Sequence, residues 1–161
     1  MHYVRSGLEG VVDVGIIVMA HFENPAQEYA SEFLRDALTW RRYVIIPLST
    51  YLGAYVIMTK YLKLKRNKVS RALVETLSLP SPAFYGSLPK AVIEKAITTA
   101  STLDISSWDG YLIELAKELQ IGTVYSLDEK LADRIKEVKV INPIPKEAIE
   151  EYYNFLEKKL K

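Results

Sequence analysis

Short apolar runs alternate along the chain with longer segments whose apolar residues recur at helical spacing. Runs of this kind, apolar almost throughout, are typical of strands that a sheet buries on both faces. Strands that alternate with helices predict an α/β domain with a mostly parallel sheet. We therefore predict a three-layer α/β/α sandwich around a central, mostly parallel sheet of four to five strands. Four of the strands are visible in the sequence, at 10–14 (GVVDV), 43–47 (YVIIP), 123–127 (TVYSL) and 138–142 (VKVIN).

The intervening segments predict helices. Asn24 followed by Pro25 is typical of an N-cap with proline at the first helical position, and this helix is expected to end near Arg41. A loop rich in proline, serine and glycine, 79–89, interrupts the helical part of the chain. No repeat or low-complexity linker divides the sequence. The other helices are predicted at 48–63, 68–79, about 90–101, 106–119, 129–137 and, closing the chain, about 145–160.

Composition narrows the chemistry that the chain can carry. The 161 residues, 49% of them apolar, are enough for a single domain, 1–161, with a sizeable core. There is no cysteine, which excludes disulfides and thiolate sites. The only histidines, His2 and His21, leave little for a zinc site or a histidine-based triad. Catalysis would therefore rest on carboxylates, hydroxyls or lysines.

Charge and hydropathy bear on location and partners. The net charge of +1 favours no class of partner, so local clusters have to be judged separately. The longest apolar stretch, 11–20, contains Asp13 and is too short to span a bilayer, and the N-terminal MHYVRSGLEG has no apolar signal-peptide core. We expect a cytoplasmic protein without membrane association. The lack of cysteine and the many lysine, glutamate and tyrosine residues indicate a thermophilic source.

Three aspartates fall near the ends of the predicted strands and helices. Asp13 ends the first strand, Asp128 follows the third, and Asp109 lies near the start of the helix that leads into the third strand. Parallel α/β sheets bind ligands outside the carboxyl ends of their strands. Carboxylates gathered there would repel one another by about 4 kcal/mol per pair, at about 4 Å and an effective dielectric of about 20, unless a cation neutralised them. An oxygen-only cluster of this kind favours Mg²⁺ or Mn²⁺.

Each acid also has a purely structural interpretation. Asp109 fits the third helical residue of a capping box that Ser106 begins. Asp128 fits the cap of the helix that follows it. Asp13 is harder to explain in this way, because an unpaired acid buried in an apolar strand costs several kcal/mol.

Four segments around these acids resemble the signature segments of PIN domains, the nuclease domains of VapC-type toxins and of many RNA-processing factors. They are VVDVGIIVMAHF, IIPLSTYLGAYVIM, ISSWDGYLIELAKEL and IGTVYSLDEKLA. The resemblance covers residues from about 10 to 143, the expected core, with the closing helix as an addition. It implies a PIN-like fold in which the strand order brings all three acids to one edge. It also implies that Asp13, Asp109 and Asp128 are the catalytic and metal-binding residues, and that Ser126 is the polar residue that helps to position the substrate.

The second acidic position of the family is missing. It is normally a glutamate about six residues after the proline that closes the second strand, and Gly53 occupies it here. Glycine inside a helix costs about 1 kcal/mol relative to alanine, so this glycine calls for a reason. Asp104 lies outside the matched segments, and Glu129 fits a capping box begun by Ser126, so neither is a strong replacement.

The resemblance implies a metal-dependent endoribonuclease that uses Mg²⁺ or Mn²⁺, a VapC-like toxin with weakened activity. Its partners would be RNA, an antitoxin protein and a second copy of the chain in a homodimer. The alternative is a degenerate, non-catalytic PIN domain that binds RNA or a protein partner. A nucleotide-binding Rossmann domain is disfavoured, because no GxGxxG follows any strand.

The residues outside the acidic cluster that could contact RNA each have a structural and a functional interpretation. The basic run KYLKLKRNK, 60–68, is either a solvated junction between helices or a grip on RNA phosphates. Trp108 lies at helical spacing with Leu112, Leu115 and Leu119, which predicts a core position, whereas base stacking is the functional alternative. The proposed RNA-backbone contacts are Lys63, Lys65, Arg66 and Lys68.

Overall fold

A five-stranded, fully parallel sheet forms the centre of the molecule. The structure, a computed structural model, describes residues 7–161, so His2 lies outside the described residues. The strand order is β3-β2-β1-β4-β5. This order confirms the predicted parallel α/β architecture. The strands are β1 (Gly10–Val12), β2 (Val44–Pro47), β3 (Phe84–Tyr85), β4 (Thr123–Tyr125) and β5 (Lys139–Ile141).

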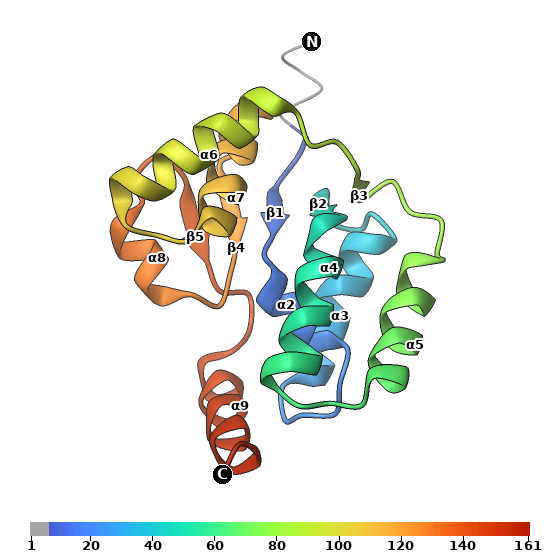
Figure 1. The fold of residues 1–161 in the computed structure, drawn as a ribbon. Coiled ribbons are helices and arrows are strands. Elements are labelled where there is room, and N and C mark those ends of the chain that lie inside the picture. The colour runs from blue at the N-terminus through green and yellow to red at the C-terminus, as the bar shows by residue number, and fades with distance from the viewer. Residues whose placement is uncertain (1–6) are drawn as a thin grey trace.

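Helices cover both faces of the sheet and make it the middle of three layers (Figure 1). Neighbouring strand residues face opposite layers: Val12 packs in the core with α2–α5 and α9, whereas Val11 packs in the core with α6, α7 and α8. The helices are α2 (Val14–Ala20), α3 (Gln27–Leu38), α4 (Ser49–Val56), the π-helix η1 (Ile57–Tyr61), α5 (Arg66–Leu77), α6 (Lys90–Leu103), α7 (Ser107–Glu118), α8 (Glu129–Arg134) and α9 (Lys146–Lys159).

The first strand is shorter than predicted, because Asp13 begins a helix that the sequence pattern does not show. β1 ends at Val12, and Asp13 is the N-cap of α2. Six of the seven residues of α2 are buried, and α2 packs against both α3 and α4. A helix buried on nearly all sides carries no polar stripe, so periodicity cannot reveal it.

The next two helices differ from prediction at their ends. α3 runs from Gln27 to Leu38. It begins later than predicted because the Asn24 side chain holds the preceding turn, accepting from Ala26 N and donating to Met19 O. The predicted helix 48–63 is confirmed as α4 continued by η1. In that last turn Leu62 N donates to Ile57 O, five residues back.

β3 lies inside the segment that the sequence predicts to be a loop, 79–89. It is a two-residue edge strand, too short and too close to prolines to show a strand pattern. Its backbone still joins the sheet, since Leu48 N donates to Tyr85 O.

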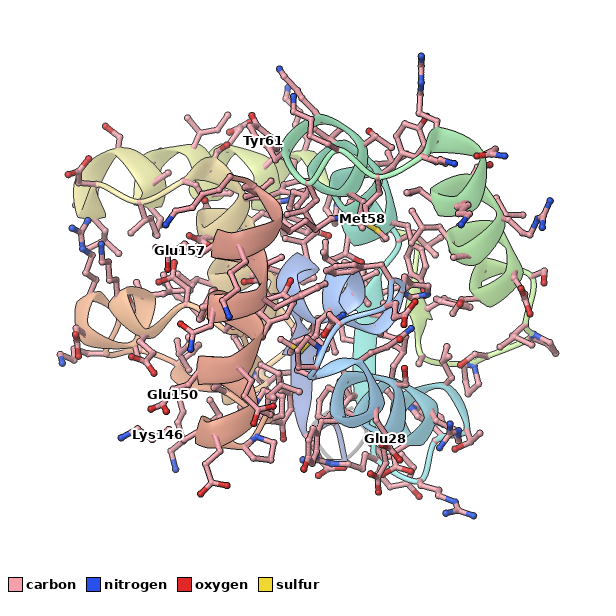
Figure 2. All side chains as sticks on the ribbon, turned by 90° about the horizontal axis from the view of Figure 1, so that it is seen from below. Glu28, Met58, Tyr61, Lys146, Glu150 and Glu157 are labelled. Atoms are coloured by element: carbon pink, nitrogen blue, oxygen red, sulfur yellow. The ribbon has the colours of Figure 1, made fainter. Side chains whose placement is uncertain are left out.

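The closing helix α9 packs beneath the end of the sheet where the strands stop (Figure 1). In Figure 2, which views the molecule from that side, α9 lies across it, with Lys146, Glu150 and Glu157 along its length. It is anchored by Tyr152 and Phe155, whose ring centroids lie 6.2 and 6.5 Å from that of Phe22. Across residues 7–161, every helix is too short or too polar to cross a membrane.

Candidate functional site

Asp13 is a buried acid whose carboxylate accepts from two sides. The chain leaves β1 and turns into α2 at this residue, so the side chain lies at the carboxyl end of the central strand. Val14 N donates to one carboxylate oxygen at 2.6 Å, and Ser126 Oγ donates to the other at 2.7 Å. Only 7% of Asp13 is exposed. Burial raises the pKa of Asp13, the two hydrogen bonds lower it in part, and the charge of Asp128 raises it again.

Ser126 joins Asp13 to Asp128. Its hydroxyl donates to Asp13 and accepts from Asp128 N at 3.1 Å. The Asp128 carboxylate caps α8 by accepting from Lys130 N and Leu131 N. The structural interpretation of Asp128 is therefore confirmed, and its charge still reaches Asp13. The expected capping box from Ser126 to Glu129 is wrong, because Asp128 is the cap of α8.

Asp109 completes the acidic cluster from the first turn of α7. Ser106 Oγ accepts from Asp109 N at 3.0 Å, so this acid does occupy the predicted capping-box position. The pKa of Asp109 is raised to about 6, chiefly by burial and also by the charges of Asp13 and Asp128, while the hydrogen bond with Ser106 lowers it in part. The structure thus brings the three predicted acids within electrostatic reach of one another, although α7 follows none of the strands directly.

These carboxylates suit a divalent cation in charge and in donor type, but they are not a preformed cage. Oxygen donors that repel one another are stabilised by Mg²⁺ or Mn²⁺. Within residues 7–161, however, no three side chains of His, Cys, Asp or Glu converge closely enough to hold a metal ion. A cation would therefore have to draw the carboxylates closer together or bind fewer than three of them.

Gly53 of α4 packs against the sequence neighbours of two of the acids. A Cβ atom at this position would lie 2.9 Å from Trp108 Nε1 and 3.2 Å from Val14 Cγ2. Val14 follows Asp13, and Trp108 precedes Asp109. The Trp108 indole therefore fills the space that a side chain at position 53 would need.

The two candidate substitutes for the missing acid lie in different places. Asp104 ends α6 in the left-handed conformation, its side chain is fully exposed, and its nearest ionic partner is Arg134 at 3.9 Å. Glu129 lies at the surface of α8 and borders the groove next to Asp128.

A groove of about 1310 Å³ leads away from the acids and is closed on one side by α9. Asp13, Ser126 and Asp128 line one end, and Tyr152 and Tyr153 of α9 line the opposite wall. The sequence alone does not place α9 at the site. The adjacent pair Tyr152 and Tyr153 in this amphipathic helix is the feature that could have indicated it, but only the fold shows that α9 lies beneath the sheet.

The basic and aromatic residues that could contact RNA differ in how far they are exposed. The four predicted phosphate contacts in 60–68 are all exposed, beside Leu62, which lines the groove. Tyr111 is buried, so it cannot offer a face to a base. The expected core position of Trp108 is wrong: this side chain is 37% exposed, whereas Leu112 and Leu115 are buried.

No protein-family model and no curated protein matches the sequence. Solved structures do match the fold. The Mycobacterium tuberculosis toxin VapC20, described as cleaving the sarcin-ricin loop, has a TM-score of 0.59 and 14% identity, over 80% of this chain and 98% of its own. A toxin–antitoxin complex from Klebsiella pneumoniae has a TM-score of 0.55 and 15% identity, over 84% and 98%. PAE2754 from Pyrobaculum aerophilum has a TM-score of 0.56 and 15% identity, over 95% and 96%.

Sequence identities of 14–15% show a shared fold only. The chemistry has to be argued from the residues of this chain. The similarity extends over nearly the whole of each solved chain. In this chain, Asp13 and Asp128 lie just after β1 and β4, at the carboxyl edge of the sheet. The chain therefore has the PIN-type fold of the VapC toxins.

Proposed function

We propose that this protein is a metal-dependent endoribonuclease of the PIN type, a VapC-like toxin with weakened activity. The observation that carries the proposal is the cluster of Asp13, Asp109 and Asp128. At the carboxyl edge of a parallel sheet, beside an open groove, the charge of Asp128 raises the pKa of Asp13, and the charges of Asp13 and Asp128 raise the pKa of Asp109. Carboxylates that only stabilised the fold would have no reason to gather where they repel.

Each residue has a definite part in this proposal. Mg²⁺ or Mn²⁺ bound by the three acids would supply a Lewis acid and an activated water for phosphodiester hydrolysis. Ser126 fixes the orientation of the Asp13 carboxylate through its 2.7 Å hydrogen bond. The groove gives a single strand room to pass the acids. The exposed basic residues of 60–68 neutralise its phosphates.

Gly53 is the reason for expecting slow cleavage. Gly53 stands where the resemblance expects the family's second carboxylate, and the indole of Trp108 fills the space beside it. Fewer carboxylates favour one weakly held cation over the pair, about 3.5–4 Å apart, that the fullest version of this chemistry uses.

A non-catalytic domain is the second candidate, and one observation favours it. The acids do not converge on a ready metal site within residues 7–161. Such a domain would bind RNA, or a protein partner, in the same groove without cutting.

The partners follow from the same proposal. The Klebsiella structure is a toxin–antitoxin complex, which supports an antitoxin as the protein partner. RNA as substrate, a homodimer and a cytoplasmic site of action complete the proposal.

Cleavage of a fluorescent single-stranded RNA tests the function. We expect slow cleavage with Mn²⁺, none with EDTA, and none by Asp13→Asn. Asp133→Asn is the matched control, because it removes an exposed carboxylate of α8 that does not line the groove. Equal cleavage by Asp13→Asn would assign the activity to a contaminant. Binding of RNA without cleavage by the wild type would establish the second candidate.

A further inference from the structure

Trp108 is a large aromatic side chain left partly open at the edge of the acidic cluster. It lies in the first turn of α7, immediately before Asp109. Its ring packs against Tyr111 at a centroid distance of 6.2 Å, with 32° between the ring planes. Trp108 and Asp13 line one small crevice, together with Ser49 and Thr50. One part of the indole is thus fixed in place, and 37% of the side chain remains exposed.

Gly53 is what lets the indole lie there. A Cβ atom at position 53 would come within 2.9 Å of Nε1 and 3.3 Å of Cζ2 of Trp108, closer than such atoms can approach without movement. The φ angle of Gly53 is not positive, so the backbone itself does not require glycine. The glycine is therefore explained by the indole that lies against α4.

We propose that Trp108, held against Gly53, stacks on an unpaired base of single-stranded RNA next to the phosphate bound at the acids. This inference rests on the proposed ribonuclease function and names a residue that positions its substrate. Aromatic side chains bind unpaired bases by stacking with little sequence preference. Trp108 is the sequence neighbour of Asp109 and borders a narrow crevice with Asp13, so a base attached to a phosphate at these acids would come within reach of the exposed part of the ring. Trp108 does not line the larger groove beside α9.

Tryptophan fluorescence can report on this contact directly. The chain has two tryptophans, and the other, Trp40, has a buried Nε1 and packs edge-on against Tyr43. In a Trp40→Phe variant, Trp108 is the sole tryptophan. Titrations are made in Mn²⁺, which lets a phosphate approach the acids, and the fluorescence is read immediately after mixing, before the slow cleavage proceeds. The two probes are a single-stranded oligouridylate and an abasic ribose-phosphate chain of the same length.

We expect the oligouridylate, and not the abasic chain, to change the fluorescence of Trp108. Loss of the ring in Trp108→Ala should weaken binding of the oligouridylate by about tenfold, as expected for one stacked base. Trp108→Phe should recover most of that loss. Gly53→Ala should weaken binding as well, because the added methyl group displaces the indole. A merely structural role for Trp108 would change the melting temperature without making binding depend on the bases.

Tyr29→Ala is the matched control. Tyr29 is 47% exposed on α3 and does not line the groove, so its loss should leave binding unchanged. Equal affinity of Trp108→Ala and wild type, or an equal response to the abasic chain, would overturn the inference. If the wild type also cuts RNA, the ribonuclease proposal survives that result. If the wild type neither binds nor cuts RNA, both proposals fail together.

Discussion

At the scale of single residues, the small side chain of Ser126 links two acids of the site. Its one hydroxyl donates to Asp13 and accepts from Asp128 N, so it orders two of the three acids. The sequence identifies Ser126 as the polar residue before Asp128. It cannot reveal that the hydroxyl reaches Asp13, because that contact joins residues 113 positions apart.

Ser126→Ala should destabilise the fold by about 1–3 kcal/mol, the usual cost of leaving a buried acceptor unpaired. The pKa of Asp13 should rise further, because the hydrogen bond that lowers it is lost. Chemical denaturation at neutral pH measures the first effect, and carboxyl chemical shifts measure the second. Ser106→Ala, which removes only a cap on α7, is the comparison. An unchanged pKa of Asp13 in Ser126→Ala would contradict this account.

Asp109 should reverse the usual dependence of stability on pH. Its pKa is raised to about 6 in the folded chain, from an ordinary 3.8. Well below pH 3.8 the group is protonated in both states. As the pH rises from 3.8 to about 6, the unfolded chain ionises it while the folded chain resists, so its contribution to the free energy of unfolding falls, and above about pH 6 that contribution stays constant.

Asp109→Asn should therefore be more stable than the wild type at about pH 7.5, in EDTA, and the difference should vanish near pH 3. Asparagine keeps the backbone N–H that Ser106 caps. Denaturation curves across this range test the sign. Asp133→Asn should show no such gain, and a difference between Asp109→Asn and wild type that is constant with pH would sink the argument.

Position 53 offers a test of the missing carboxylate. Gly53→Glu alone should destabilise the protein, because its Cβ meets Trp108 and Val14 and overpacking costs about 1–3 kcal/mol. With Trp108→Ala in the same chain, the glutamate has the space that the indole fills in the wild type. The double variant should then show a larger Mn²⁺-induced rise in melting temperature than Trp108→Ala. Gly53→Gln with Trp108→Ala is the uncharged control, and equal shifts in both doubles would show that position 53 contributes no ligand.

At the scale of elements, two of the acids are also helix caps. Asp13 caps α2, and Asp128 caps α8. The sequence predicts the cap at Asp128, since a short amphipathic segment follows it. It does not predict the cap at Asp13, because α2 is apolar almost throughout and continues the hydrophobic pattern of β1. For the same reason the predicted first strand is too long.

The double role of Asp128 can be separated by two substitutions. Asp128→Asn keeps an oxygen that accepts from Lys130 N and Leu131 N, whereas Asp128→Ala removes it. We expect Asp128→Ala to lose about 1 kcal/mol of stability and Asp128→Asn to lose little. Both should lose Mn²⁺-dependent cleavage. Thermal melts and the RNA assay measure the two effects, and full cleavage by Asp128→Asn would remove this residue from the metal site.

At the scale of the whole molecule, the parallel sheet determines which residues meet. The parallel direction of the strands could be predicted from the alternation of apolar runs and helices, whereas their order comes from the structure alone. The edge strand β3 could not, because two residues carry no pattern, and its place depends on β2 beside it. The groove also belongs to this scale, since α9 closes it from a segment more than a hundred residues away from Asp13.

Metal binding should couple the acidic cluster to the stability of the whole fold. A cation that binds only the folded chain stabilises it by about 2.7 kcal/mol at 100 times its dissociation constant. The acids have to draw together before they can share an ion, so the affinity should be low and the rise in melting temperature should need high Mn²⁺ concentrations. Asp13→Asn should abolish the rise, and Asp133→Asn should keep it.

The same titration separates a specific site from general screening of charge. Screening acts through ionic strength, so NaCl at matched ionic strength should leave the melting temperature well below the value in Mn²⁺. Mn²⁺ should also lower the pH at which Asp109 ionises, because a bound cation favours the carboxylate. A melting temperature that rises equally in NaCl and Mn²⁺, in wild type and Asp13→Asn alike, would mean that these three acids gather without holding a metal.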